Sequence, residues 1–216
     1  MSREMILSMV RESIKNNRIV YNEVSYVAPM KLTHTDLLEE YKFNQINNKT
    51  IIKEATSSSL LETISDILEE NNSKKVLYNT DLVLNLDSLK SAYSMIPYLE
   101  SVDSIRDELF NIDTSIVQAR CGVANLGIVG ISSGLKSPRL SSLITDICIY
   151  LLSKDNIVET LHDGINFIKQ YEENHTGTKT IPTNIVFVAG PSRTADIELQ
   201  TVFGVHGPRI TYVVLY

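Results

Sequence analysis

The sequence has little cysteine and no tryptophan: two cysteines among 216 residues. Cys121 and Cys148 stand alone, with no cysteine or histidine at the spacing of a metal site. An iron–sulfur cluster or a structural zinc site usually needs about four such ligands, so we expect neither in this chain. Lone cysteines in apolar surroundings are typical of buried, reduced thiols in a reducing compartment.

Long apolar runs and an excess of basic charge are also missing. The longest stretch without a charged residue covers 121–135 and is rich in Gly and Ser, whereas a membrane span needs about 20 mainly apolar residues. Glu4 and Glu12 make the amino terminus unlike a secretory signal. The net charge of −6 argues against nucleic acid and anionic membranes as partners. We therefore expect a cytoplasmic protein.

What the sequence does contain is the periodicity of an α/β domain. Apolar residues recur at helical spacing in 3–16, 33–42, 58–70, 103–110 and 156–173. Short β-branched runs predict strands at 50–52, 76–78, 116–119, 128–131, 147–152, 185–189 and 210–215. The strands at 116–119 and 128–131 are close in sequence, so we expect antiparallel neighbours joined by a glycine loop.

The organisation predicted from these elements is one α/β domain with a mixed sheet over 21–216, preceded by a helix within 1–20. No repeat or Gly- and Pro-rich linker divides the chain. The first helix is amphipathic, and such a helix packs either on its own domain or on a partner.

A Gly-Pro-Ser turn follows the strand predicted at 185–189 and leads into a short helical pattern. Gly190 allows a positive φ, and Ser192 or Thr194 can cap the N–H groups that follow. Exposed N–H groups at a strand-to-helix turn bind anions, and open α/β sheets bind ligands at the carboxyl ends of strands. A small carboxylate or phosphate is the expected ligand. The predicted ligand-binding residues of this turn are Gly190, Pro191, Ser192, Arg193, Thr194 and Gly207.

Three further side chains near this turn are candidates for catalysis: Asp196, Glu198 and His206. The two carboxylates either complement the helix dipole or pair with Arg193. His206 lies in a glycine-rich loop and is either a proton carrier at the same strand ends or a residue that bonds a backbone carbonyl. Spacing alone predicts a small-anion site near Gly190 and His206.

The same segment resembles the LUD-domain family. The family pattern is Gly-Pro-Ser-x-Thr-Ala-Asp-Ile-Glu, then Gly-Val-His-Gly-Pro, and the sequence matches it at 190–198 and 204–208. Residues 138–143 and a helix start at 156–158 are also similar to the family. The resemblance implies a three-layer α/β/α sandwich, as in ribose-phosphate isomerases, glucosamine-phosphate isomerases and CoA transferases.

The resemblance also implies a function, which is involvement in the oxidation of L-lactate to pyruvate. Small members of this kind are expected to be subunits that act beside iron–sulfur proteins and whose own chemical step is undefined. It implies no cofactor in this chain and iron–sulfur clusters on the partners, in agreement with the two lone cysteines.

The first glycine loop departs from the family, which commonly shows Ala-Glu-Thr-Gly-Thr where this chain has Ala-Asn-Leu-Gly-Ile at 124–128. Asn125 cannot act as a base or a nucleophile, because an amide neither takes a proton nor attacks at neutral pH. The loop residues kept as candidate ligand contacts are Gly122, Asn125 and Gly127. Alternatives remain: a stand-alone enzyme acting on a phosphorylated or CoA-linked molecule, or a ligand-binding module that keeps only the fold.

Overall fold

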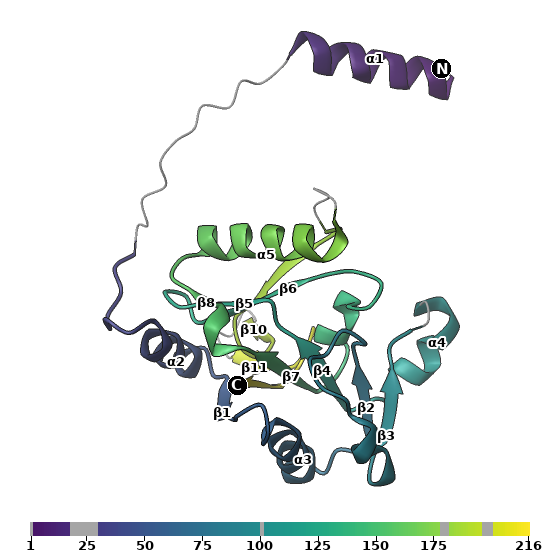
Figure 1. Ribbon diagram of the computed structural model, residues 1–216. Coiled ribbons are helices and arrows are strands. Elements are labelled where there is room, and N and C mark those ends of the chain that lie inside the picture. Colours follow the sequence, from purple (N-terminus) through teal and green to yellow (C-terminus); the bar gives the residue numbers. More distant parts are fainter. Residues whose placement is uncertain (1, 18–29, 100–101, 178–181, 196–200) are drawn as a thin grey trace.

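A six-stranded parallel sheet forms the centre of the fold, which is known from a computed structural model (Figure 1). The structure describes residues 2–17, 30–99, 102–177, 182–195 and 201–216. In spatial order the strands are β1 (Ile51–Glu54), β12 (Ile210–Leu215), β7 (Ile147–Leu152), β4 (Thr114–Gln118), β2 (Lys75–Tyr78) and β3 (Ser94–Pro97). Every pairing in this sheet is parallel.

A second, four-stranded sheet packs against one face of the first. Its strands in spatial order are β8 (Ile157–Val158), β5 (Cys121–Val123), β6 (Ile128–Ser132) and β9 (Ile185–Val188). Strand β6 is antiparallel to both β5 and β9, and β8 is parallel to β5. A separate antiparallel hairpin joins β10 (Arg193–Ala195) to β11 (Thr201–Phe203).

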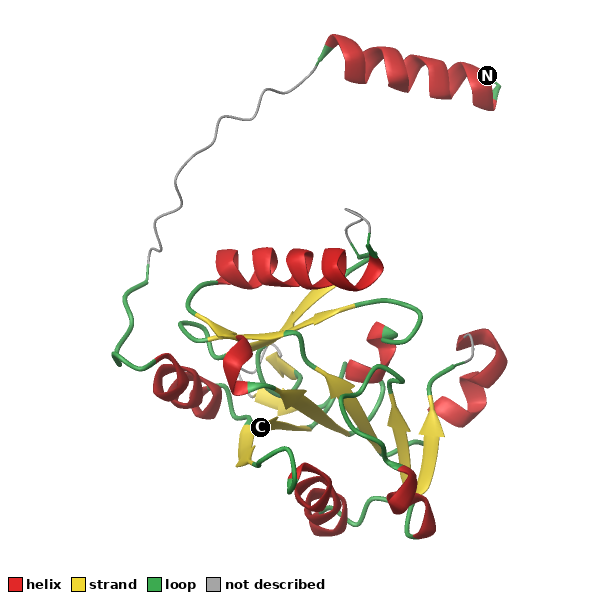
Figure 2. Ribbon diagram, in the orientation of Figure 1, coloured by secondary structure: helices red, strands yellow, loops and turns green. Residues whose placement is uncertain are grey.

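Helices flank the two sheets (Figure 2), except the amino-terminal helix, which buries none of its residues. The described helices are α1 (Arg3–Asn16), α2 (Leu37–Asn47), α3 (Leu60–Glu70), α4 (Val102–Leu109) and α5 (Leu161–Thr176), with short 3-10 turns at Asp87–Ser91, Arg139–Ser142 and Lys154–Asn156. Helix α5 begins with a capping box between Thr160 and Asp163, and Gly177 ends it in the left-handed conformation. No helix of the described ranges is long and apolar enough to cross a bilayer.

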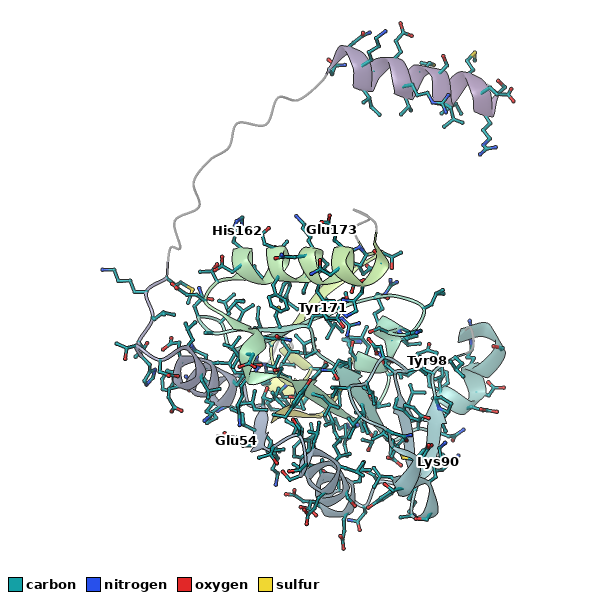
Figure 3. The ribbon with its side chains drawn as sticks, viewed as in Figure 1. Glu54, Lys90, Tyr98, His162, Tyr171 and Glu173 are labelled. Atoms are coloured by element: carbon teal, nitrogen blue, oxygen red, sulfur yellow. The ribbon has the colours of Figure 1, made fainter. Side chains whose placement is uncertain are left out.

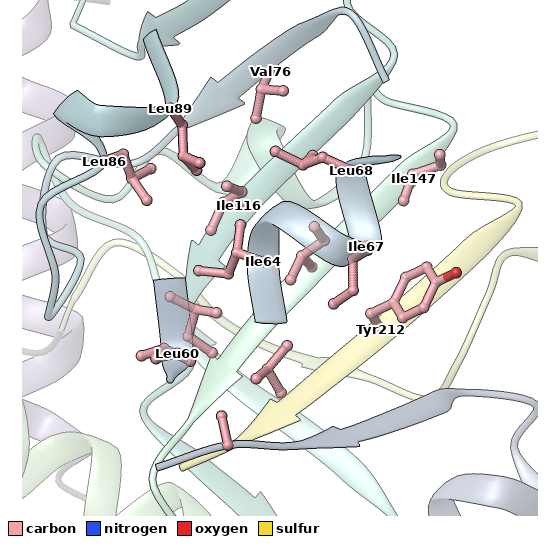
Figure 4. Close-up of a cluster of buried hydrophobic side chains, with 14 residues drawn as sticks. Leu60, Ile64, Ile67, Leu68, Val76, Leu86, Leu89, Ile116, Ile147 and Tyr212 are labelled. Carbon is pink, nitrogen blue, oxygen red and sulfur yellow. The ribbon is translucent and has the colours of Figure 1, made fainter. Parts of the chain in front are cut away.

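The parallel sheet is buried on both faces, because its side chains alternate between two cores. In β7, Ile149 and Leu151 join the core under α3, whereas Tyr150 and Leu152 join the core between the two sheets. Figure 4 shows the first of these cores, with Ile64 and Ile67 of α3 lying over the sheet. Helix α5 covers the other side of the second sheet.

The α/β fold class is confirmed, and the structure refines its layers. Between the parallel sheet and α5 lies the second sheet, so the order of layers is α3, parallel sheet, mixed sheet and α5 (Figure 1). The mixed pairing expected for the central sheet is found in this second sheet instead.

The strands predicted at 116–119 and 128–131 are both present but are not neighbours. The first is β4 of the parallel sheet, and the second is β6 of the mixed sheet. The partner of β6 is β5, which lies inside the predicted glycine loop. The helix predicted from 156 begins only at Leu161, because Ile157–Val158 pair with β5 as β8. This also corrects the family-like helix start at 156–158.

Three predictions concern the amino-terminal third. Helix α2 begins later than predicted and is capped by Asp36, whose carboxylate accepts from the N–H groups of Leu38 and Glu39 at 2.8 and 3.0 Å. The helix predicted at 3–16 is confirmed as α1, and none of its residues is buried. The expected boundary near residue 20 lies outside the described residues.

The chain order places a topological switch point between β2 and β4. From β2 the chain continues to β3 at one edge, whereas from β4 it passes through β5 and β6 of the mixed sheet and returns as β7, toward the other edge. Diverging loops at such a point leave a crevice at the carboxyl ends of the two strands, where open α/β sheets bind ligands. The fold therefore predicts a ligand site at the carboxyl ends of β2 and β4, after Tyr78 and Gln118.

Candidate functional site

The two predicted glycine loops meet at one end of the mixed sheet, against the carboxyl end of α2. Asn48 donates from Nδ2 to the carbonyl oxygens of Leu126 and Gly127, at 2.8 and 2.7 Å. The backbone of Asn48 also touches Gly190, because a Cβ placed there would lie 2.0 Å from the Asn48 carbonyl oxygen. We call this region, residues 124–127, 189–193 and 203–209, the glycine-loop end.

Two glycines of this end are required by packing. Gly127 has φ +57°, and a Cβ there would lie 2.3 Å from the backbone carbon of Asn44. Gly190 has φ +68° and the close approach to Asn48. A side chain at either position meets both an unfavourable backbone conformation and a rigid neighbour. These two predicted site glycines therefore have a structural reason that involves no ligand.

The other candidates of the first loop are enclosed. Gly122 lies in β5, where a Cβ would lie 2.7 Å from the ring of Tyr41. Asn125 is buried, and its backbone N–H donates to the carbonyl of Glu159 at 3.1 Å. Its side-chain Oδ1 has no hydrogen-bond partner among the described residues, an uncommon state for a buried acceptor.

Ser192 connects the two halves of the second glycine loop, residues 190–192 and 204–208. Its N–H donates to the carbonyl of Pro208 at 2.8 Å, its carbonyl accepts from Gly204, and its Oγ accepts from the N–H of His206 at 3.3 Å. Gly207 lies alongside, since a Cβ there would be 3.3 Å from the Cβ of Ser192. The structure thus brings 190–192 and 204–208 together, as their shared motif led us to expect.

The helix predicted after Ser192 is wrong, because Arg193–Ala195 form β10 and pair with β11. Ser192 therefore caps no helix, and this turn offers no row of helix N–H groups to an anion. Pro191 is buried and Thr194 half-buried, whereas Arg193 is exposed and donates from Nη2 to the carbonyl of Ala189 at 3.0 Å. The candidates Asp196 and Glu198 lie outside the described residues.

His206 also lies at an unexpected end of the sheet. It is exposed and precedes β12, so it lies at the amino ends of the parallel strands rather than at their carboxyl ends. Nearby, the guanidinium of Arg209 lies 3.5 Å from the carboxylate of Asp146, and both side chains are largely exposed. Arg193 and Arg209 are thus exposed guanidinium groups at the glycine-loop end, and the second of them is paired with Asp146.

A cleft of about 640 Å³ opens at the switch point, at the opposite end of the mixed sheet. Residues 80–82 after β2, Arg120 after β4, residues 134–137 after β6 and the last turns of α5 line it. Figure 3 shows Tyr171 on the side of α5 that faces the sheets, with His162 and Glu173 on the outward side. This volume is typical of pockets that hold small molecules.

Arg120 forms the floor of this cleft and is 5% exposed. Its Nε donates to Ser132 Oγ at 2.8 Å, and its Nη2 donates to Asp81 Oδ2 at 2.5 Å. Glu172 Oε1 lies 3.7 Å from Nε and accepts from Ser132 Oγ at 2.5 Å. The guanidinium also lies over the ring of Tyr171, 4.8 Å from its centroid. One buried cation thus faces two carboxylates.

One signal in the sequence points to this cleft, although it belongs to no motif. Arg120 is a single charge between two apolar stretches, 116–119 and the uncharged run from 121. A charge in such a position is buried and therefore needs partners. Asp81 and Glu172 are far from it in the sequence, so the partners could not be identified without the fold.

The cysteines do not offer a cluster site. Cys148 lies in β7 of the parallel sheet and Cys121 in β5 of the mixed sheet, and both are buried. Burial raises the pKa of Cys121 to about 12 and that of Cys148 to about 11, which opposes the thiolate form that binds iron. No group of three potential metal ligands occurs within the described ranges.

Comparison with known proteins gives consistent matches. A family model described as LUD domain matches residues 38–216. Lactate utilization protein C 1 of Bacillus mycoides is 30% identical over 179 residues, covering 77% of this chain and 73% of that protein. Lactate utilization protein C of Halalkalibacterium halodurans is 26% identical, covering 83% of each chain. An uncharacterized protein of Neisseria meningitidis is 28% identical, covering 74% of this chain and 69% of its own length.

A solved structure supports the fold. The crystal structure of a DUF162 family protein from Deinococcus radiodurans superimposes with a TM-score of 0.59 and 16% sequence identity, covering 87% of this chain and 99% of that one. At this identity the likeness concerns the fold.

Proposed function

This chain belongs to the LUD domain family, and from that premise we propose that it takes part in L-lactate utilization, as a subunit of a system that oxidises L-lactate to pyruvate. The observation that carries the proposal is the family match over 38–216, together with relatives whose name is lactate utilization protein C. The proposal extends that printed role to this chain.

Partners are part of the proposal. Oxidation of L-lactate to pyruvate releases two electrons and two protons, from the hydroxyl-bearing carbon and its hydroxyl group, and the electrons need an acceptor. The buried thiols of Cys121 and Cys148 lie on different sheets and cannot hold a cluster together. We therefore propose that iron–sulfur clusters on partner proteins accept the electrons. The contribution of this chain is then to bind and place a ligand or a partner.

The glycine-loop end is the place we propose for a small carboxylate. Arg193 and Arg209 are exposed cations there, and exposed His206 lies beside Ser192. An arginine binds a carboxylate with charge-assisted hydrogen bonds, so Arg193→Ala should weaken such binding by about 1.5–3 kcal/mol. Titration with L-lactate and pyruvate measures this, with Arg139→Ala, another exposed arginine, as the matched control.

The experiment for the function as a whole is deletion of the gene followed by growth on L-lactate as carbon source. We expect a growth defect that the wild-type gene restores, and recovery of iron–sulfur proteins with the tagged chain. Normal growth of the deletion strain together with purification free of iron–sulfur proteins would overturn the proposal.

A ligand-binding module without a role in lactate oxidation is the second candidate, and the cleft at the switch point favours it. The two candidates separate in the growth experiment, because a module of this kind leaves growth on L-lactate unchanged.

A further inference from the structure

We propose that the cleft at the switch point is a second ligand site, which takes an uncharged molecule carrying hydroxyl groups on an apolar or ring-shaped body. The site goes beyond the proposed function, since L-lactate is a small anion. We call it the Arg120 cleft.

The position of the cleft is the first argument. It opens after β2 and β4, where the chain diverges toward the two edges of the parallel sheet. Its volume of about 640 Å³ falls in the middle of the range of pockets that enclose ligands much larger than lactate. A ligand that fills it therefore has a body as well as a polar end.

Charge at the floor is the second argument. The guanidinium of Arg120 is paired with Asp81 and lies close to Glu172, with side-chain exposures of 5%, 15% and 17%. In a partly buried place charges interact strongly, and at the floor a further anion would meet two carboxylates for one buried cation. Lys136 on the wall is exposed, so solvent and salt screen its charge more than they screen the charges of the floor. An uncharged end group avoids the repulsion.

An unsatisfied acceptor is the third argument. Asp81 lines the cleft, and its Oδ1 is buried and has no hydrogen-bond partner among the described residues. A buried acceptor without a donor is costly, so the matching ligand group is a donor. A hydroxyl group donates and is small enough to approach the Asp81 carboxylate.

The walls suit the body of such a ligand. Leu82 and Leu135 give apolar surface, and Arg120, Tyr171 and His175 form a stack in which the two rings lie 3.9 Å apart at 21°. Exposed His175 ends this stack, so the ring of a ligand can continue it.

Calorimetric titration of the purified full-length chain with matched pairs tests the proposal. The pairs are adenosine with AMP, and phenyl β-glucoside with phenyl β-glucuronide; in each, the second member carries an anionic group where the first has a neutral hydroxyl or hydroxymethyl group. We expect an uncharged member to bind with a Kd below about 1 mM, and about tenfold more tightly than its anionic counterpart. No binding of either uncharged probe, or equal or tighter binding of the anionic members, overturns the proposal.

Asp81→Asn locates the binding. This change keeps the shape of the side chain and removes one of the two carboxylates, so the roughly tenfold preference for the uncharged member should vanish or reverse. Glu172→Gln should act in the same direction and replaces Asp81→Asn if that variant does not fold. Glu173→Gln, on the outward side of α5, is the control and should leave the preference unchanged. A preference that survives both cleft variants places the binding elsewhere and overturns the assignment. Growth on L-lactate tests the proposed function separately.

Discussion

The two ends of the mixed sheet are held together by different kinds of contact. At the glycine-loop end, backbone packs on backbone: Gly127 and Gly190 lie against α2, and Asn48 ties the loops with two hydrogen bonds. At the Arg120 cleft, side chains meet instead, with a buried arginine between two carboxylates. The first end is rich in sequence motif and closely packed, whereas the second has no motif and encloses a cavity.

This difference separates two meanings of a glycine-rich motif. A glycine is needed wherever backbones approach closely, whether the neighbour is a ligand or another part of the chain. Here the neighbour of Gly127 and Gly190 is α2, so the motif marks how the domain is closed. Binding at this end therefore depends on exposed side chains such as Arg193, and binding in the cleft on the buried charges.

The largest expected effect is that of Arg120→Met. The change keeps much of the apolar volume but leaves Asp81 and Glu172 buried without their cation, which should cost about 3–5 kcal/mol of unfolding free energy. Urea denaturation measures it, with Arg139→Met at the exposed 3-10 turn as the control expected within about 0.5 kcal/mol. Adding Asp81→Leu to Arg120→Met should recover part of the loss. A loss below about 1 kcal/mol in the single variant would mean that the network contributes little to the cleft end.

The next effect in size is at the glycine-loop end. Gly190→Ala adds a Cβ 2.0 Å from the Asn48 carbonyl oxygen at φ +68°, and should cost about 3 kcal/mol. Gly177 has φ +67° with nothing within 4 Å, so Gly177→Ala should cost about 1 kcal/mol. Gly134→Ala, on the cleft loop with open space around it, should change stability by less than about 0.5 kcal/mol. Equal losses at all three glycines would contradict the packing argument.

A smaller loss is expected for Asn48→Ala, which should cost about 2 kcal/mol. The change leaves the carbonyls of Leu126 and Gly127 without the donors they now have, in a part-buried place. Asn47→Ala, one residue earlier and exposed, is the control in the same urea experiment and should have little effect. If both variants unfold at the same urea concentration, α2 does not hold the loops in the way described.

Much of the fold could be predicted from the sequence where one pattern decides one element. The apolar run at 147–152 is β7, and the helical spacing at 58–70 gives α3. Strand β5 was missed because Cys121–Val123 is short and contains Gly122, so its pairing with β6 decides its structure rather than its own propensity. The pairing of β10 with β11 likewise overrides the helical pattern after Ser192.

The candidate site divides in the same way. The two halves of the second loop could be predicted to meet, because the motif runs through both, and Ser192 does join them. The Arg120 cleft could not be predicted, because Asp81, Arg120 and Glu172 come from three distant segments and none belongs to a motif. Such a cluster exists only once the strands are ordered.

The smallest expected effect is a change of stability at acid pH, and it involves a contact between α2 and the first glycine loop. Burial would raise the pKa of Glu40, but hydrogen bonds from His34, Thr33 and Asn44 outweigh it and lower the pKa from 4.5 to about 2. When the pH lies below the unfolded pKa of Glu40, the folded state binds fewer protons than the unfolded state does. The stability due to Glu40 is therefore present above about pH 4.5 and is lost as the pH falls toward about 2. Glu40→Gln should therefore lower the melting temperature at pH 6 and differ less from wild type at pH 2.5.

Glu39→Gln, exposed on the same helix, is the control for this comparison, and its difference from wild type should not follow that pH course. The same groups connect Glu40 to the loop, because Asn44 donates both to its carboxylate at 3.0 Å and to the carbonyl of Ala124 at 2.9 Å. Protonation of Glu40 weakens the first of these bonds and loosens Asn44. The protection of the Gly127 amide, whose N–H donates to Ala124, is the slowing of its exchange relative to an unfolded chain at the same pH, and it should then fall on acidification before the protection of β6 beside the Arg120 cleft does. A simultaneous loss of protection at both places would show that the two ends of the mixed sheet open as one unit.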